Sequence, residues 1–172
     1  MRIPGSTLPS TVTEPSNSTF PVEMSTLRSD TTRSTETPVA LTIGRPEIAA
    51  RAKGFGLEIV AYDPFPNHGW AESAGVTYLE VDELFARARI VSLHAPSMAS
   101  TRHLANAARL ASMPEGGCLI NTARGELVDE VALLAALNAG RMWGAALDVV
   151  ADEPATAAQA ALIAHPKVIT TS

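Results

Sequence analysis

Along most of this chain, short apolar runs alternate with segments in which apolar positions recur at helical spacing. The runs are rich in Val, Ile, Leu and Ala, as expected for buried strands, and Gly, Pro and Asp residues separate them from the segments around them. Alternation of strands and helices is typical of βαβ units that form a parallel sheet. The predicted strands are 39–43, 57–62, 77–79, 90–93, 117–121, 144–149 and 168–170.

Helices are predicted between these strands, which favours a doubly wound α/β fold with helices on both faces of the sheet. Asp129 is placed to cap the last predicted helix, and Gly140 follows its end. That helix carries an apolar stripe expected to face the core, formed by Val131, Leu134, Ala135 and Leu137. The predicted helices are 46–53, 70–74, 82–88, 102–113 and 130–138.

Residues 1–38 differ from the rest of the chain. They are crowded with Ser, Thr and Pro and show the apolar period of neither a strand nor a helix. This composition predicts a disordered tail, which leaves 39–172 as a single domain. A secretory signal would need a continuous apolar segment, and a transit peptide would avoid the acidic residues that this tail contains.

Composition excludes several classes of function. A net charge of −5 offers no basic surface for nucleic acid, and no apolar run approaches the ~20 residues that a membrane-spanning helix needs. No metal site is predicted, because the sequence has no HExxH pattern and no Cys/His cluster. The single cysteine, Cys118, lies in an apolar run and is expected to be a small buried hydrophobe. A reducing, cytoplasmic setting is therefore expected.

Two polar motifs follow neighbouring predicted strands. Arg124 comes just after strand 117–121, and the acidic pair Asp152-Glu153 comes just beyond strand 144–149. Because parallel strands end at the same edge of a sheet, the arginine and the acidic pair are expected to lie together there. Open α/β proteins bind their ligands at this edge.

Five motifs follow one another along the sequence: Tyr62-Asp63-Pro64, Ser92-Leu93-His94-Ala95-Pro96, Leu119-Ile120-Asn121-Thr122-Ala123-Arg124-Gly125, Ala145-Ala146-Leu147-Asp148-Val149 and Glu153-Pro154. In this order they resemble the NAD-binding domain of the D-isomer-specific 2-hydroxyacid dehydrogenases, the family that includes phosphoglycerate dehydrogenase. The resemblance covers about Ile43 to the end of the sequence. It implies a Rossmann-like domain of an oxidoreductase that acts on the CH–OH group of a small 2-hydroxy or 2-oxo acid, with NAD as the cofactor.

The resemblance also assigns residues to the cofactor. Asp63 matches a carboxylate that binds the adenosine ribose hydroxyls and repels a 2′-phosphate, which favours NAD over NADP. The alternative is that Asp63 and the proline after it only form a turn. Asp148 matches the acid at the nicotinamide end. The residues expected to lie along the cofactor are His94, Ala95, Pro96, Thr122, Ala123 and Arg124.

The phosphate-binding turn departs from the family pattern. A dinucleotide fold of this type opens with G-x-G-x-x-G, whose glycines let the pyrophosphate approach the backbone. Here only the last glycine, Gly44, is present, with Val39 and Leu41 in the places of the other two. Their side chains would crowd the phosphates, so weak cofactor binding is expected.

Catalysis in the family uses a histidine as acid/base, a glutamate that hydrogen-bonds it, and an arginine that binds the substrate's carboxylate and carbonyl oxygen. By motif match Arg124 is that arginine and Glu153 that glutamate. The alternatives are a surface-loop arginine and an acid at a helix start. The family's histidine follows the last strand, but this sequence reaches Ser172 without it. The remaining histidines, expected to be structural or solvated, are His68, His94, His103 and His165.

The sequence therefore predicts an NAD-binding domain that is truncated at both ends and inactive alone, since the family's substrate domain is also missing. Two alternatives stay open. One is half of a split enzyme whose other half is a separate chain. The other is a non-catalytic nucleotide-binding or dimerisation module, and a homodimer stays open with it.

Overall fold

The computed structural model describes residues 38–42, 46–152 and 156–171. The tail predicted to be disordered lies outside these residues except for Pro38, which begins the first strand. Its disorder and the domain boundary after it stay predictions.

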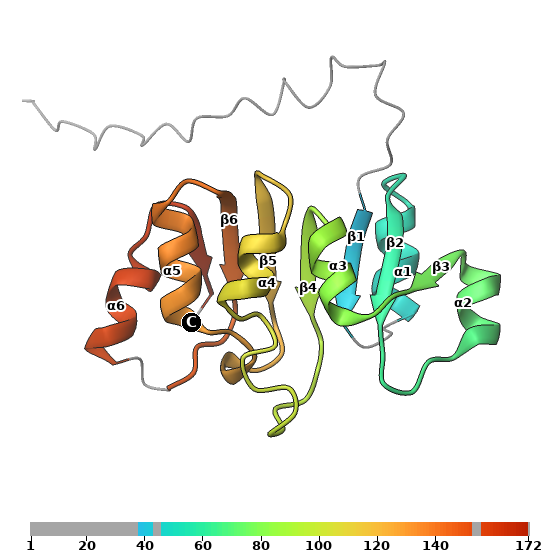
Figure 1. The fold of residues 1–172 in the computed structure, drawn as a ribbon, viewed down its shortest axis with the longest axis horizontal. Coiled ribbons are helices and arrows are strands. Elements are labelled where there is room, and N and C mark those ends of the chain that lie inside the picture. The colour runs from blue at the N-terminus through green and yellow to red at the C-terminus, as the bar shows by residue number, and fades with distance from the viewer. Residues whose placement is uncertain (1–37, 43–45, 153–155, 172) are drawn as a thin grey trace, which may run out of the picture. The chain divides into compact units, whose positions relative to one another are not determined.

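A single parallel sheet of seven strands runs through the described part of the chain, in the order β3-β2-β1-β4-β5-β6-β7 (Figure 1). Neighbouring strands are parallel at every pairing. The order reverses at β1, which pairs with β2 on one side and with β4 on the other. The strands are β1 (Pro38–Thr42), β2 (Glu58–Tyr62), β3 (Val76–Tyr78), β4 (Ile90–Leu93), β5 (Gly117–Asn121), β6 (Met142–Leu147) and β7 (Val168–Thr170).

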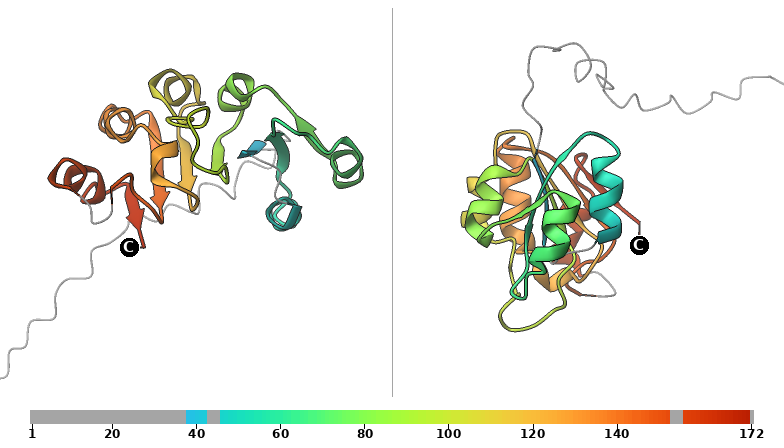
Figure 2. Two further views of the ribbon diagram at one scale, coloured as in Figure 1. Left: turned by 90° about the horizontal axis from the view of Figure 1, so that it is seen from below. Right: turned by 90° about the vertical axis from the view of Figure 1, so that its right-hand side faces the viewer.

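Helices cover the two faces of this sheet unequally. Figure 2 shows α3, α4, α5 and α6 on one side of the sheet and α1 on the other, so the predicted doubly wound α/β class is confirmed. The helices are α1 (Pro46–Lys53), α2 (His68–Ala74), α3 (Val81–Arg87), α4 (Ala107–Ser112), α5 (Glu130–Asn138) and α6 (Ala157–Ile163), with a 3₁₀ turn η1 (Gly125–Leu127).

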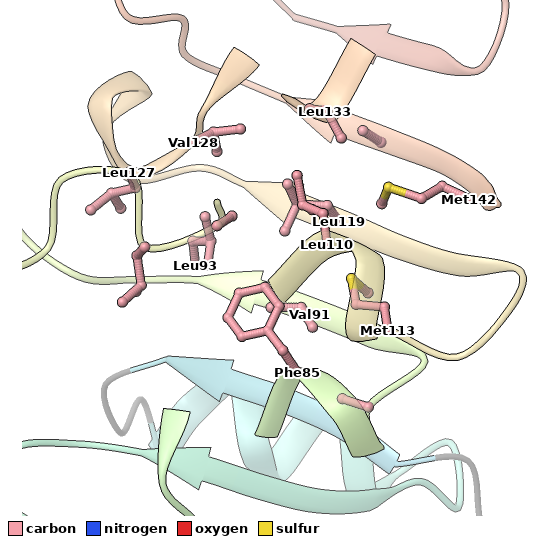
Figure 3. Close-up of a cluster of buried hydrophobic side chains, with 14 of the residues drawn as sticks. Phe85, Val91, Leu93, Leu110, Met113, Leu119, Leu127, Val128, Leu133 and Met142 are labelled. Atoms are coloured by element: carbon pink, nitrogen blue, oxygen red, sulfur yellow. The ribbon is translucent and has the colours of Figure 1, made fainter. Parts of the chain in front are cut away.

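The larger of two apolar clusters fills the space between the sheet and the helices α3 to α6 (Figure 3). Alternate strand residues contribute to it, because successive side chains of a strand point to opposite faces. A smaller cluster lies around β2 and includes Ala49 of α1 and Ala71 of α2. The labelled members of the larger cluster are Phe85, Val91, Leu93, Leu110, Met113, Leu119, Leu127, Val128, Leu133 and Met142.

The opposite face of β5, β6 and β7 is more open. Cys118 and Ile120 of β5 and Ala146 of β6 are only half-buried, and Ile169 of β7 is 60% exposed. Partial burial raises the pKa of the Cys118 thiol, which fits the predicted apolar role better than that of a nucleophile. None of the described helices is long and apolar enough to cross a membrane.

Two helices differ from their prediction. The segment predicted as one helix over 102–113 is helical only in α4, because its first half pairs with the 3₁₀ turn instead. The amide of His103 donates to the carbonyl of Glu126 (2.8 Å), and that of Ala105 to the carbonyl of Leu127 (2.9 Å). Helix α6 was not predicted, although its capping box of Thr156 and Gln159 is visible in the sequence.

The stripe predicted for α5 is wrong in two of its members. Val131 is 81% exposed and Ala135 is also exposed, whereas Leu133 and Leu137 are fully buried. Almost every position of this helix is apolar, so more than one stripe has helical spacing and periodicity alone does not choose between them. The predicted N-cap is confirmed, since the Asp129 side chain accepts a hydrogen bond from the amide of Ala132.

The unequal covering of the sheet predicts unequal costs for truncated side chains. Leu119→Ala empties a site beneath the helices and should lower the free energy of unfolding by about 2–5 kcal/mol. Ile169→Ala, on the open face, should lower it by only about 0.5 kcal/mol. Urea denaturation followed by circular dichroism measures both. Equal losses would show that the open face is packed as tightly as the covered one.

Candidate functional site

The carboxyl ends of five strands are aligned by the sheet register. Thr42, the last residue of β1, pairs with Tyr62 of β2 and Leu93 of β4, and Asn121 of β5 pairs with Leu93 and with Leu147 of β6. The predicted site residues come directly after these ends, so the fold brings most of them to one edge. Those that the structure describes are Asp63, His94, Ala95, Pro96, Thr122, Ala123, Arg124 and Asp148.

A cleft of about 650 Å³ opens at this edge, where the loops after β4 and β5 face the start of α1. This is the point at which the strand order reverses, and ligands of open α/β sheets bind there. Six of the predicted residues line the cleft. Its lining is Glu47, Ile48, His94, Ala95, Pro96, Thr122, Ala123 and Arg124.

A buried amide holds the loop that carries Arg124. The Asn121 side chain is fully buried, and its Nδ2 donates to the carbonyl of Arg124 (2.8 Å) while its Oδ1 accepts from the amide of Ala123 (3.1 Å). Its backbone carbonyl also accepts from the amide of Asp148 (2.9 Å). Asn121 therefore folds the turn after β5 and joins it to the end of β6. The sequence motif contained this residue, but its role was not predicted.

Gly125 lets the same loop lie against the segment after β6. A Cβ on Gly125 would lie 2.0 Å from the carbonyl carbon and oxygen of Val150, so only glycine fits. The contact places Arg124 beside Val150 and Ala151, with which it lines a second cleft of about 310 Å³. The guanidinium is exposed, and its Nη1 donates to the carbonyl of Ala123 (2.6 Å).

Hydrogen bonds hold two residues that flank the predicted Glu153 in the sequence, Ala151 and Thr156. Glu130 accepts from the amide of Ala151 through Oε1 (2.8 Å) and from the Nε2 of Gln159 through Oε2 (2.9 Å). Gln159, 5% exposed, in turn accepts from the amide of Thr156 (2.7 Å). Glu153 itself lies outside the described residues, so its approach to Arg124 stays a prediction. Glu130 and Gln159 were not predicted to serve the site.

Asp63 forms the turn that was the alternative interpretation. Its Oδ1 accepts from the amide of Phe65 (2.9 Å), as in an Asx turn after β2. The half-buried Asp63 also lines a cleft of about 350 Å³ together with Tyr78, Glu80 and Glu83. This cleft lies at the carboxyl ends of β2 and β3. A turn and a contact with a ribose do not exclude each other, so the predicted ribose role stays open.

The remaining predicted residues are placed as follows. Asp148 is exposed and accepts a hydrogen bond from the hydroxyl of Thr171. Val39 and Leu41 lie within β1, where their backbones pair with β2 and β4. Gly44 lies outside the described residues, so the shape of the phosphate-binding turn stays untested.

Of the four histidines, His94 is the one that lines the main cleft, and its Nε2 lies 2.8 Å from the Oγ of the buried Ser92. His68 is the first residue of α2. His103 lies before α4 with a φ of 51°, and the Nδ1 of His165 accepts from the amide of Lys167 (3.1 Å).

Across the described residues, no group of His, Cys, Asp and Glu side chains could hold a metal ion.

The close contact at Gly125 predicts that Gly125→Ala will be costly. The added methyl overlaps the backbone of Val150, which should lower the free energy of unfolding by about 3 kcal/mol and shift the Arg124 loop. Gly69→Ala is the matched control, because its methyl would meet no atom closer than 3.8 Å and Gly69 lies in α2. The control should leave stability unchanged or raise it by up to about 1 kcal/mol. Thermal unfolding and amide NMR shifts measure both, and a tolerated Gly125→Ala would contradict the contact.

Comparisons with known proteins agree with this arrangement. Residues 42–172 match the family model of the D-isomer specific 2-hydroxyacid dehydrogenase, NAD binding domain. The chain is 44% identical to a D-lactate dehydrogenase of Treponema pallidum over 103 residues, which are 59% of this chain and 30% of that protein. It is 42% identical to a D-3-phosphoglycerate dehydrogenase of Rattus norvegicus over 127 residues, 74% of this chain and 23% of that protein.

Solved structures show the same fold. The D-lactate dehydrogenase of Lactobacillus jensenii with NAD⁺ superimposes with a TM-score of 0.71 at 31% identity, over 78% of this chain and 44% of that one. The enzyme of Aquifex aeolicus, complexed with NAD and lactic acid, gives 0.72 at 29% identity, over 78% and 45%. The chain thus spans less than half the length of these relatives. It belongs to the D-isomer specific 2-hydroxyacid dehydrogenase family, and residues 42–172 match the family's NAD-binding domain.

Proposed function

We propose that this chain binds NAD along the carboxyl edge of its sheet, with the main cleft at the centre. The observation that carries the proposal is the lining of that cleft by six residues that the family motifs assign to the cofactor. NAD is long, and the aligned ends of β2, β1, β4, β5 and β6 offer a continuous edge for it. The polar groups at this edge also fit NAD. The carboxylate of Asp63 can accept hydrogen bonds from ribose hydroxyls, and the hydroxyl, amide and guanidinium groups near the cleft can donate to the phosphates and the nicotinamide amide.

The roles follow the order of the strands. Asp63 after β2 is proposed to bind the adenosine ribose, and the loop 94–96 to lie beside the cofactor. Thr122, Ala123 and Asp148, after β5 and β6, are proposed to contact the nicotinamide end. NAD, when bound, supplies the hydride acceptor.

The substrate class proposed is a small 2-hydroxy or 2-oxo acid. Arg124 offers a planar fork of N–H donors that matches a carboxylate and a neighbouring carbonyl oxygen, which a lysine would not match. Glu153 is proposed to hydrogen-bond an acid/base histidine supplied from outside these 172 residues. The related D-lactate and D-3-phosphoglycerate dehydrogenases support this class of substrate. We propose that the 172 residues alone bind the cofactor without turnover.

Titration with NADH tests the binding and the lack of turnover together. Nicotinamide fluorescence should change saturably on adding the protein. The absorbance of NADH at its nicotinamide band should then stay constant with pyruvate, glyoxylate, hydroxypyruvate or phosphohydroxypyruvate present. An unsaturable fluorescence signal would overturn the cofactor proposal, and NADH oxidation with any of these acids would overturn the second one.

Asp63→Asn separates the turn from the ribose role. The amide oxygen still accepts from Phe65, so the turn is kept, but the charge that repels a 2′-phosphate is lost. The ratio of the dissociation constants for NADPH and NADH should fall by roughly tenfold, equivalent to about 1.4 kcal/mol. Binding of both cofactors is measured by fluorescence, and Glu72→Gln on α2 controls for net charge. An unchanged ratio of the two dissociation constants would contradict the ribose role and show that Asp63 only forms the turn.

A further inference from the structure

Glu47 brings a negative charge into the main cleft, and no sequence motif assigned it to the site. It lies in the first turn of α1, has an exposed side chain, and lines the cleft together with His94, Thr122 and Arg124. The cleft therefore holds one acidic side chain from α1 and one basic side chain from the loop after β5.

The position of Glu47 matters because of what the start of this helix does in a dinucleotide fold. The helix after β1 turns its free amides toward the cleft, and a pyrophosphate gains from those amides and from the helix dipole. Here the first helical residue is Pro46, which has no N–H to offer, and the second is a carboxylate. Both features weaken the binding of an anion at the start of α1.

No basic side chain neutralises Glu47 in the described part of the chain. Each of the two ion pairs found there joins other residues, Arg87 with Glu58 and Arg109 with Asp82. Arg51, one turn further along α1, donates to the backbone carbonyl of Glu47 (2.8 Å) and not to its carboxylate. The Nη1 of Arg124 is directed to the carbonyl of Ala123. Among the described residues the carboxylate of Glu47 thus has no ion-pair partner, and its charge and that of Arg124 both face an occupant of the cleft.

We propose that Glu47 is a specificity-determining residue that disfavours the pyrophosphate of a dinucleotide in this cleft. The inference rests on the proposed function, since it takes NAD as the ligand and its phosphates as lying at the start of α1. Like charges that share a partly exposed cleft repel one another, and dissolved salt screens that repulsion. Glu47 thus lowers the affinity for NADH in a salt-dependent way.

The test is a fluorescence titration with NADH of the full chain and of two variants at low and high ionic strength. Glu47→Gln removes the charge and keeps the shape of the side chain. Glu115→Gln removes a charge from an exposed residue in the turn before β5, at the opposite edge of the sheet, and is the matched control. Circular dichroism verifies that each variant is folded.

Glu47→Gln is expected to bind NADH roughly threefold to tenfold more tightly than the unchanged chain at low salt. The gain should shrink to less than about twofold near 1 M salt, where the screening length is only ~3 Å. The control should match the unchanged chain at both salt concentrations.

Three results would overturn the inference. Equal affinities of Glu47→Gln and the unchanged chain would refute the role of Glu47 and leave the proposed function standing. A gain that persists at high salt would refute a screened charge repulsion as the effect of Glu47. Failure of every variant to bind NADH at either salt concentration would refute the proposed function and this inference with it.

Discussion

The register of the parallel sheet is the constraint on which the whole site depends. Because β2, β1, β4, β5 and β6 pair without antiparallel reversals, their carboxyl ends fall at one edge. Residues far apart in the sequence, such as Asp63 and Asp148, are thereby placed along one line without any direct contact between them. A slip of one residue in any pairing would turn the side chains of that strand to the other face. The backbone ladder, and not the polar residues, fixes the layout of the site.

The buried Asn121 carries this order into the loops. A buried amide without partners costs free energy, so its position at the end of β5 is tolerated only because its side chain and backbone are bonded to the following turn and to β6. The same bonds leave the Arg124 loop little freedom. Gly125 then brings that loop into backbone contact with Val150. One satisfied polar group and one missing side chain thus hold the loops of neighbouring strands together.

Strands were easier to predict than helices in this chain, and the reason is physical. Strand β4 is buried at three of its four positions, and β5 is buried or half-buried at every position, so 90–93 and 117–121 show as continuous runs with few charged residues and were predicted with their observed bounds. In α5 nearly every residue is apolar, and burial depends on how the helix lies against the sheet, which its own sequence does not encode. The segment before α4 pairs with residues some two dozen positions away, beyond any local pattern.

The site shows the same division. Motifs at strand ends placed His94, Thr122 and Arg124 at the carboxyl edge of the sheet, where they line one cleft, because a strand end is a local feature and the edge follows from the parallel fold. Glu130 and Gln159 were not predicted, because their hydrogen bonds span long sequence separations. Glu130 of α5 accepts from Ala151, 21 residues away in the segment after β6, and from Gln159 of α6, 29 residues away. Asp63 was assigned to the ribose with a turn as the alternative, and its turn bond to Phe65 does not decide between them, because the same carboxylate can also contact a ribose.

Glu47 shows how the stability of a helix and the binding of a ligand can oppose each other. An acidic residue in the first turn is favourable for α1 itself, because it faces the positive end of the helix dipole. A phosphate placed at the same end would draw on the same partial charge and the same amides. Pro46 sharpens the competition, since it favours the start of the helix and at the same time removes one of the donors. The helix is therefore stabilised from within its own sequence by groups that occupy the electrostatic role a bound anion would otherwise fill.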